Sequence, residues 1–370
     1  MIVYIVLFAI TCGVAYIAKG KLESDKVYLS QTQESKNNYI TRGQFGNMMI
    51  IAGIFFLLFG VSAARIAIGH DYWEYTSVFN LLDQERYVST EIGFNLLVKF
   101  VYALFTFEKR YIIVFAIVAF ATIYFFMKGL FDQADNFFLG FLLFMSFGYY
   151  LSSFNNIRYY LVLSIAFYSI KYLLKKDYLR FCIIIILASF FHMAVLFVLL
   201  AYPLALIRWK KWMIPIVAAF VASLIFLPNV YRRLIFIFYP YYENSIFDTG
   251  ETSYVNIARC AGILIFALIF YKSALKNNRK NMFYFNLNLF ALIVYSCCSF
   301  IPVISRVGFL LNISQIVLVP AVVETIEKKW LKNTLTVLIV LAGIGYFALV
   351  LHQCKDDATR IVPYINWITN

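Results

Sequence analysis

Long apolar segments, separated by short polar ones, run along almost the whole chain. A helix needs about 20 mostly apolar residues to cross the hydrocarbon core of a bilayer. Segments close to this length occur at 1–18, 48–64, 111–127, 136–154, 159–174, 212–230, 254–271, 282–304, 307–323 and 334–351. A further apolar stretch, 181–207, has room for one tilted helix or for two short helices that meet at Phe191-His192. The pattern predicts an all-α, polytopic integral membrane protein with about 11–12 transmembrane segments in a single domain, 1–370.

Basic residues between the apolar segments predict the topology. Lysine and arginine are enriched in the short cytoplasmic loops of membrane proteins. If 181–207 crosses twice, as a re-entrant or short-helix hairpin, 20 of the 32 basic residues lie inside and 12 lie outside. If it crosses once, each side holds 16. The charge distribution therefore favours the hairpin, with both termini outside, although each arm is short for a span.

Two of the segments placed outside are long, 65–110 and 231–253. Within the first, 90–105 repeats polar side chains every four residues and apolar side chains on another face, which predicts a helix lying along the membrane interface. The polar face holds Glu91, Asn95 and Lys99, and the apolar face holds Ile92, Leu96 and Phe100. The second segment is rich in aromatic residues, which either stack on sugar rings, with Tyr241 as the candidate contact, or form an interfacial belt.

Composition and charge exclude several classes of protein. Hydrophobic residues make up 63% of the chain and charged residues 14%, so the apolar surface exceeds what a soluble fold can bury. A net charge of +13 would suggest nucleic acid binding in a soluble protein, but here it follows the positive-inside pattern, so no nucleic acid partner is expected. The six cysteines lack metal-ligand spacing, and the sequence has no Walker, GxGxxG or HExxH motif. We expect no disulfide framework, no cofactor and no metal.

Four arginines lie at or just inside the predicted outer ends of spans: Arg65, Arg158, Arg259 and Arg306. An arginine at mid-bilayer depth costs about 2.5–3.5 kcal/mol on insertion scales, and less near the interface, where its side chain reaches the headgroups. Any one of them could serve only as a headgroup anchor. Four guanidinium groups on one side also suit phosphate oxygens, which they bind bidentately. We predict that these arginines, Arg158 and Arg306 above all, bind a lipid phosphate or diphosphate.

Asp71 and His192 are the candidates for a general base. Asp71 and Tyr75 share one face if their segment is helical, although Asp71 could equally be a helix N-cap. His192 is the histidine inside an apolar segment, where burial favours its neutral, proton-accepting form. The charge of Arg65 would weaken Asp71 as a base, so His192 is favoured for this role and Asp71 for orienting an acceptor hydroxyl. Glu91 is the next candidate.

The order and spacing of these residues resemble the EpsG family of exopolysaccharide polymerases, which are similar to the Wzy-type O-antigen polymerases. The resemblance covers about 48–325 and is densest in 65–192. It rests on Arg65-x-x-x-Gly69-x-Asp71-Tyr72-x-x-Tyr75, Glu91-x-Gly93-Phe94, Asn155-Asn156-x-Arg158 and Phe191-His192. The family's usual glutamine after the last arginine is Tyr159 here.

The resemblance implies a GT-C-like glycosyltransferase of the bacterial cytoplasmic membrane, with an active site that faces outward. Such an enzyme joins oligosaccharide repeat units carried on undecaprenyl diphosphate. Arginines stabilise the charge that grows on the diphosphate leaving group, and no metal is required. Its partners are the lipid-linked glycan, as donor and acceptor, the bilayer and a candidate regulator of chain length. The implied site residues are Asp71, Glu91 and His192 for catalysis, with Tyr75 and Asn156 beside the arginines for binding.

Two other classes stay open. A transporter or flippase of lipid-linked glycans would have paired inverted halves and polar groups near mid-membrane, where the main candidates are Asn286, Asn288 and Asn312. A membrane O-acyltransferase would rest on a buried histidine and would need an acyl donor site, which leaves the outer arginines unexplained. Turnover of purified lipid-linked repeat units without ATP would separate the three classes.

Overall fold

The computed structural model describes residues 1–32, 42–238, 250–356 and 359–368, together with Pro240, Glu243, Ser245 and Asp248. This part of the chain is helical apart from turns and one isolated bridge between Arg65 and Asn366, which confirms the all-α class. The helices are α1 (Ile2–Thr32), α2 (Arg42–Ala64), α3 (Tyr72–Asp83), α4 (Ile92–Leu104), α5 (Tyr111–Gln133), α6 (Phe137–Ser146), α7 (Tyr149–Ser152), α8 (Ile157–Leu174), α9 (Tyr178–Ser189), η1 (Met193–Phe197), α10 (Val198–Ala205), α11 (Met213–Phe226), α12 (Pro228–Phe238), α13 (Tyr254–Ile269), η3 (Tyr271–Leu275), α14 (Arg279–Cys297), α15 (Ile304–Asn312), α16 (Gln315–Glu324) and α17 (Lys329–Gln353).

Several helical segments of the described chain are long and apolar enough to cross a membrane. Five meet both conditions: Phe45–Ala64, Tyr111–Gln133, Ile157–Leu174, Ile304–Glu324 and Lys329–Gln353. The pair α11–α12 forms a sixth if its helices, bent by 81°, count as one span. This is fewer than the 11–12 predicted segments, because other apolar segments form helical stretches of only 10–17 residues, and α14, with 19 residues, is less apolar than the spans. The polytopic membrane class is confirmed, and five of the predicted segments, or six with the bent pair, reach spanning length.

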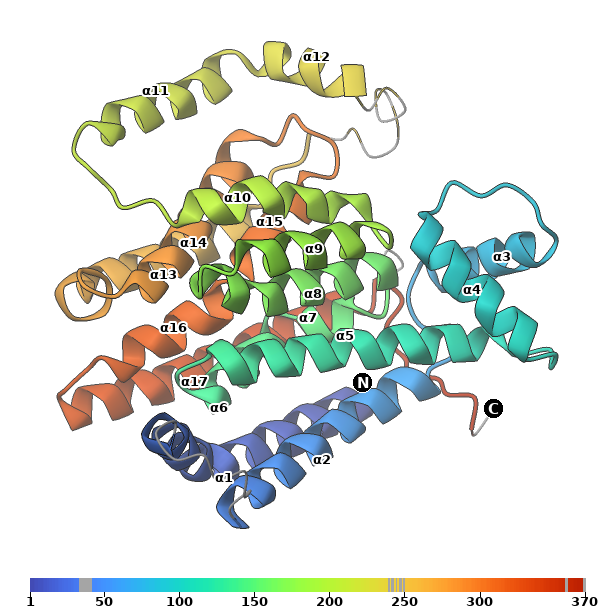
Figure 1. The fold of residues 1–370 in the computed structure, drawn as a ribbon, viewed down its shortest axis with the longest axis horizontal. Coiled ribbons are helices and arrows are strands. Elements are labelled where there is room, and N and C mark those ends of the chain that lie inside the picture. The colour runs from blue at the N-terminus through green and yellow to red at the C-terminus, as the bar shows by residue number, and fades with distance from the viewer. Residues whose placement is uncertain are drawn as a thin grey trace.

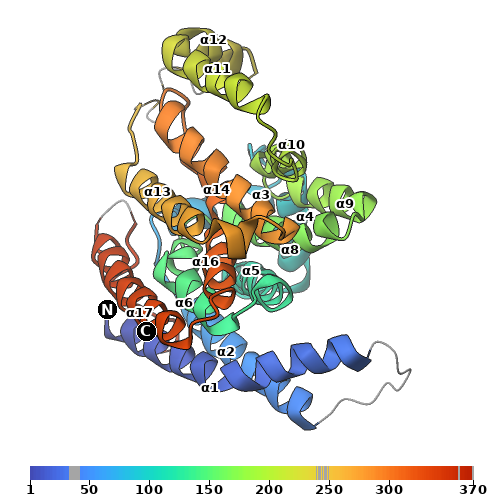
Figure 2. The ribbon, with the colours of Figure 1, turned by 90° about the vertical axis from the view of Figure 1, so that its left-hand side faces the viewer.

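Helices α5 and α8 lie side by side at the centre of the bundle (Figure 1). The pair α1–α2 covers one side of them, and α6, α16 and α17 pack together on another. The facing sides of these helices form one large apolar core, with Phe126, Phe144 and Tyr149 fully buried. Helices α11 and α12 stand apart from the bundle (Figure 2), and Leu224 is the buried residue of α11. Exposed apolar helices of this kind are suited to lipid.

The stretch 181–207 folds as a hairpin of short helical arms. Helix α9 leads to a turn at Phe190–His192, and η1 with α10 runs back beside α9 (Figure 1). Beyond the end of the second arm, the indole of Trp209 donates a hydrogen bond of 2.7 Å to the side chain of Asn286 on α14. The reversal confirms the predicted hairpin with its bend at Phe191-His192.

Ion pairs gather at the end of the bundle where α5 and α8 terminate, the end that faces the viewer in Figure 2. Four lysines pair there with acidic side chains: Lys128 with Asp132 (2.7 Å), Lys171 with Asp132 (2.8 Å), Lys280 with Asp135 (2.5 Å) and Lys332 with Glu324 (2.5 Å). All four lysines come from segments that the positive-inside pattern places on one side. The fold therefore groups these segments as the charge pattern predicts.

The sidedness of the hairpin is open to a direct test. We expect a cysteine at Lys211, in a cysteine-free variant, to resist an impermeant thiol reagent added to intact cells. A cysteine at the exposed His352, at the opposite end of the bundle, should react under the same conditions. The reason is the excess of basic residues on the Lys211 side. Equal labelling at the two positions would contradict the double crossing.

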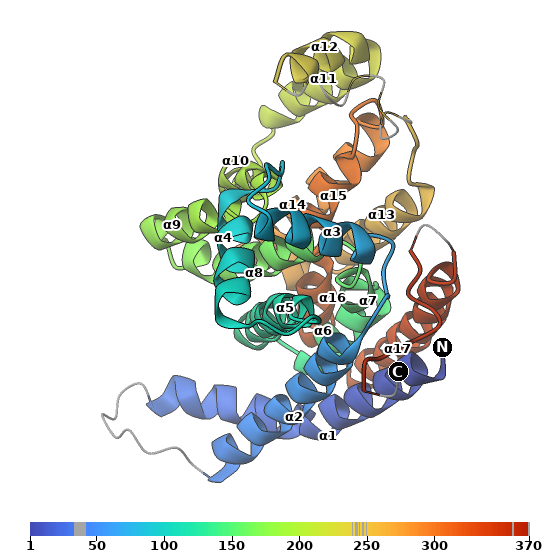
Figure 3. The same ribbon diagram turned by 90° about the vertical axis from the view of Figure 1, so that its right-hand side faces the viewer.

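Helices α3 and α4 cap the other end of the bundle (Figure 3), over a second buried cluster that includes Phe79, Phe94 and Phe115. Helix α4 falls within the predicted 90–105 and is amphipathic as predicted. Its outward face carries an apolar ridge at spacings of four residues, each side chain 60–63% exposed: Ile92, Leu96, Phe100 and Leu104. An exposed ridge of this kind fits the interfacial placement, which stays a prediction.

Candidate functional site

Glu91 lies at the start of α4, where this helix meets the bend of the hairpin. The amide of Gly93 donates a hydrogen bond of 2.8 Å to the carbonyl of Phe190, and a Cβ at Gly93 would lie 2.8 Å from the same oxygen. A larger residue would therefore push the two elements apart. The close approach brings the Glu91 carboxylate to the second arm, where the amide of Met193 donates to Oε1 (3.2 Å).

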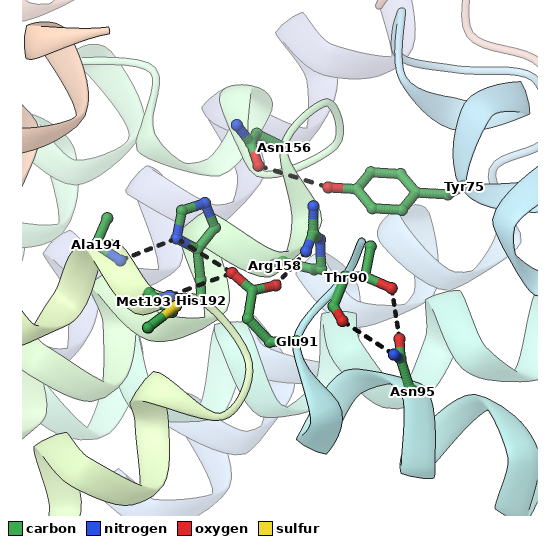
Figure 4. A network of polar contacts seen from close by, with 9 residues as sticks. All are labelled: Tyr75, Thr90, Glu91, Asn95, Asn156, Arg158, His192, Met193 and Ala194. Carbon is green, nitrogen blue, oxygen red and sulfur yellow. Dashed lines mark hydrogen bonds and ion pairs between the residues drawn. The ribbon is translucent and has the colours of Figure 1, made fainter. Parts of the chain in front are cut away.

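Arg158, in the first turn of α8, forms an ion pair with Glu91 through Nη1 and Oε2 (Figure 4). Its guanidinium carbon also lies 5.7 Å from the ring centre of Tyr75 and 5.5 Å from that of Phe94. Nε of Arg158 is buried without a hydrogen-bond partner in the described structure, and the same holds for Nε of Arg65 and of Arg259. Glu91 and the rings hold the guanidinium in place, and Glu91 engages it through Nη1, which leaves other donors of the group for an anion.

His192 lies at the bend of the hairpin, after α9 and immediately before η1, and is 9% exposed. Its Nδ1 accepts a hydrogen bond from the amide of Ala194 (3.2 Å) and lies 3.9 Å from Oε1 of Glu91. Burial, together with the charges of Arg306 and Arg158, lowers the pKa of His192 to about 3. The imidazole is therefore neutral, with its proton on Nε2, because Nδ1 is the acceptor.

Asp71 is brought to the same region by a close contact between two loops. Gly69 has φ +99°, a backbone conformation that favours glycine, and a Cβ there would lie 2.7 Å from the carbonyl oxygen of Phe154. Both the backbone conformation and the lack of space therefore require glycine at this position. The adjacent amide of Asp71 donates to the side chain of Asn155 (2.9 Å). The contact joins the start of α3 to the start of α8, which carries Arg158.

The charge state of Asp71 depends on its neighbours. Burial and the nearby Glu74 raise the pKa of its carboxyl group above the ordinary value, while His70, Arg306 and Arg158 act in the opposite direction. In the described chain, the carboxylate has no hydrogen bond or ion pair. A free carboxylate with a raised pKa is a better proton acceptor than an ordinary aspartate.

Arg306 completes the set from α15. The hydroxyl of Tyr159 donates to the backbone carbonyl of Arg306 (2.5 Å), and the Tyr159 ring stands edge-on to His192, with 5.7 Å between ring centres. The guanidinium has no hydrogen bond or ion pair within the described residues and lines a cavity of about 260 Å³ together with Asn155 and Asn156. Asp71, Glu91, Arg158, His192 and Arg306 are called the charged cluster below.

The remaining predicted residues fall into three groups. Tyr75 and Asn156 lie beside the charged cluster, with a long hydrogen bond of 3.5 Å from the Tyr75 hydroxyl to Oδ1 of Asn156 (Figure 4). Arg65 and Arg259 lie outside the charged cluster and form hydrogen bonds with other groups of the protein. Tyr241 lies outside the described residues, so its predicted sugar contact stays a prediction.

Arg65 and Arg259 are both held by groups of the protein itself. Arg65 is 2% exposed, lies over the ring of Phe154 (4.7 Å) and donates from Nη1 to the carbonyl of Ser62 (2.6 Å). Arg259 donates to Tyr346 (3.1 Å) and to Asn256 (2.8 Å). Their positions fit a role in packing the helices at this end better than direct contact with a substrate.

Sequence reasoning missed the C-terminal segment, which closes the other side of the 260 Å³ cavity. Gln353, Thr359 and Ile361 line it together with Tyr159 and Arg306. This segment is short and has no helical or strand period, so no local pattern indicated that it returns to the site. Asn155 was noticed only as a motif position, and its bond to the Asp71 amide required the fold.

A helical, multi-pass membrane protein with a partly unpaired arginine cluster at one end of its bundle is the class that the fold and the site define. The family model described as the EpsG family matches residues 48–366, so the chain belongs to the EpsG family. The resemblance seen in the sequence is thereby confirmed, and it places the protein in exopolysaccharide biosynthesis. No curated protein and no solved structure gives a significant match to the chain.

Proposed function

We propose that the protein is a polysaccharide polymerase that joins undecaprenyl-diphosphate-linked repeat units at the outer face of the bacterial cytoplasmic membrane. The observation that supports this most is the charged cluster. It unites residues from five separate parts of the chain at the end opposite the lysine ion pairs. By the positive-inside rule, the end with those lysines is cytoplasmic, so the cluster faces outward. The proposal also includes an outward location of both termini, a GT-C-like fold and a partner that regulates chain length.

The chemistry follows from the roles that each group can take. The acceptor hydroxyl gives its proton to a carboxylate while its oxygen attacks the anomeric carbon of the donor. The bond from that carbon to the diphosphate oxygen breaks, and the diphosphate leaves with the electron pair. Arg158 and Arg306 would stabilise the charge on the leaving oxygens. Because the leaving group is already a stable anion, we propose that no metal takes part.

Asp71 is the better base in this arrangement, which reverses the roles favoured on sequence grounds. A histidine with a pKa of about 3 is a weak proton acceptor, and Nδ1 of His192 is already engaged by Ala194. Its Nε2–H is then suited to donate a hydrogen bond to a diphosphate or sugar oxygen. Glu91 is tied to Arg158 and to the Met193 amide, so we assign it to positioning rather than proton transfer.

The transporter alternative gains little support from the deep polar residues. Asn288 donates to the carbonyl of Cys260 (3.0 Å) and accepts from Gln315 (2.7 Å). Asn312 accepts from Tyr149 (2.8 Å) and donates to Tyr295 (3.2 Å). These asparagines are used in bonds between helices, as buried polar groups in membrane bundles commonly are.

The proposal is tested by turnover of purified protein on lipid-linked repeat units, without ATP and with excess chelator. Arg306→Lys should lower the rate about 10²–10³-fold, as expected when a preorganised donor to the developing charge is lost. Arg259→Lys is the matched control, because Arg259 is bonded to Asn256 and Tyr346, and its effect should be much smaller. Wild-type turnover by Arg306→Lys, or a strict requirement for one metal, would contradict the proposal.

A further inference from the structure

The C-terminal segment crosses the α3–α4 end of the bundle as a strap, defined here as residues 359–367. It runs along the segment that leads from α2 to Asp71. Backbone amides of that segment donate to the strap at three places: Ile66 to Ile365 (3.1 Å), Gly69 to Arg360 (3.0 Å) and His70 to Thr359 (3.1 Å). In the other direction, the backbone amide of Trp367 donates a hydrogen bond to the carbonyl of Ala64 (3.0 Å).

The strap is anchored on both sides of these bonds. The hydroxyl of Tyr4 donates to the carbonyl of Ile361 (3.0 Å), whose side chain is 1% exposed. The hydroxyl of Tyr364 donates to the carbonyl of Val61 (2.9 Å). A segment of this length without helix or sheet needs such bonds to keep one position. The strap is therefore a fixed wall, and it fixes the loop that carries Asp71.

The 260 Å³ cavity lies between this wall and the charged cluster. It is lined by Arg306, Asn155 and Tyr160, and also by Thr359 and Ile361 of the strap and by Gln353 at the end of α17. Gln353 is an exposed residue, and its side-chain amide has no hydrogen-bond partner in the described structure. The side chain is therefore available to a ligand.

The lining chemistry fits one class of ligand. Side-chain amides can both donate to and accept from hydroxyl groups, and an aromatic ring offers an apolar face beside them. Pockets for drug-sized molecules measure about 300–1,000 Å³, so a cavity slightly below this range holds a single ring better than an oligosaccharide. Arg306 at its wall would place that ring directly beside a bound diphosphate.

We propose that this cavity is a subsite for the sugar ring attached to the lipid diphosphate, and that Gln353 determines which sugar it accepts. The inference rests on the proposed function, because it takes Arg306 as a ligand of the diphosphate. It adds a recognition element from the C-terminal end of the chain, far in sequence from the Arg, Asp and His motifs. Gln353 touches the sugar in this proposal and takes no part in proton transfer.

The test compares lipid binding by protein in nanodiscs, with four probes. One is undecaprenyl diphosphate, and the others carry one glucose, one galactose or one N-acetylglucosamine on the same lipid. For the wild type, at least one sugar should improve binding over the bare lipid about tenfold, and Gln353→Leu should lose that gain. His352→Leu is the control, since His352 is the exposed neighbour on α17 that does not line the cavity.

The two proposals fail in different arms of this experiment. Unchanged affinity for the bare lipid shows that Gln353→Leu is folded, and Gln353→Asn, which keeps an amide, should retain part of the gain. If Gln353→Leu prefers the same sugar as the wild type, or if no sugar binds better than the bare lipid, the subsite is overturned. If the bare lipid binds equally well to Arg306→Lys, the proposed function fails instead.

Discussion

Arg158→Lys is expected to lower turnover about 10²–10³-fold, while Arg110→Lys leaves it nearly unchanged. Arg158 is held by Glu91, which engages Nη1, and by two aromatic rings, so the guanidinium keeps further donors for an anion. Lysine keeps the charge but presents a single flexible ammonium in place of that fork. The measurement is initial rate on lipid-linked repeat units at matched protein levels.

Arg110 provides a matched control for that variant. It also pairs with a carboxylate, Asp83 (2.5 Å), and lies over a ring, Tyr102 (4.1 Å), but it is outside the charged cluster. Loss of an ion pair in general would affect both variants alike. An Arg158→Lys enzyme as active as the wild type, or an equal loss in Arg110→Lys, would show that Arg158 does not bind the substrate.

Glu91→Gln tests whether Glu91 acts by positioning Arg158 or by contacting the substrate itself. The amide can still accept from the Met193 backbone, but the charge that orients Arg158 is gone. We expect a smaller loss than for Arg158→Lys, and the double variant should be no worse than Arg158→Lys alone. Such non-additivity is typical of residues that act through one another. Fully additive losses would indicate an independent role for Glu91.

Asp71→Asn is expected to reduce turnover about 10²–10⁴-fold, the range for loss of a general base, with a smaller loss in His192→Gln. Asparagine keeps the size of the side chain and the backbone bond to Asn155, but it cannot accept the proton. His192→Gln removes a donor at Nε2 and leaves the base in place. A full loss in His192→Gln, with Asp71→Asn active, would restore the roles first favoured from the sequence.

The pH dependence gives a second readout for the same assignment. Because the pKa of Asp71 is raised, the base becomes protonated, and activity falls, at a pH above the ordinary aspartate value of about 3.9. His192 has a pKa of about 3 and stays neutral above that value, so it should produce no inflection near pH 6.5. We expect His192→Gln to keep the acidic limb of the profile. A wild-type inflection near pH 6.5 that disappears in His192→Gln would contradict Asp71 as the base.

Much of the fold follows from local patterns. Apolar length predicts where the helices lie, and the four-residue repeat in 90–105 predicts α4, because both depend only on neighbours along one helix. The choice of a hairpin over a single crossing for 181–207 follows from the charge on either side of it. Helix lengths were less predictable. The stretch 136–154, for example, is divided between α6 and α7 at Gly148, whose backbone is left-handed (φ +79°) and so interrupts the helix.

The sequence by itself determined the class of protein, the helical segments and the residue types of the site, since hydrophobic period and charge are local properties of a chain. Only the tertiary structure decided which of these groups meet. It joined Glu91 to Arg158 across 67 positions, buried Arg65 against Phe154 and brought the strap back to the loop before Asp71. These contacts depend on how distant elements pack, on close approaches such as that of Gly93 to Phe190, and on which buried polar groups find partners. No periodicity encodes that information.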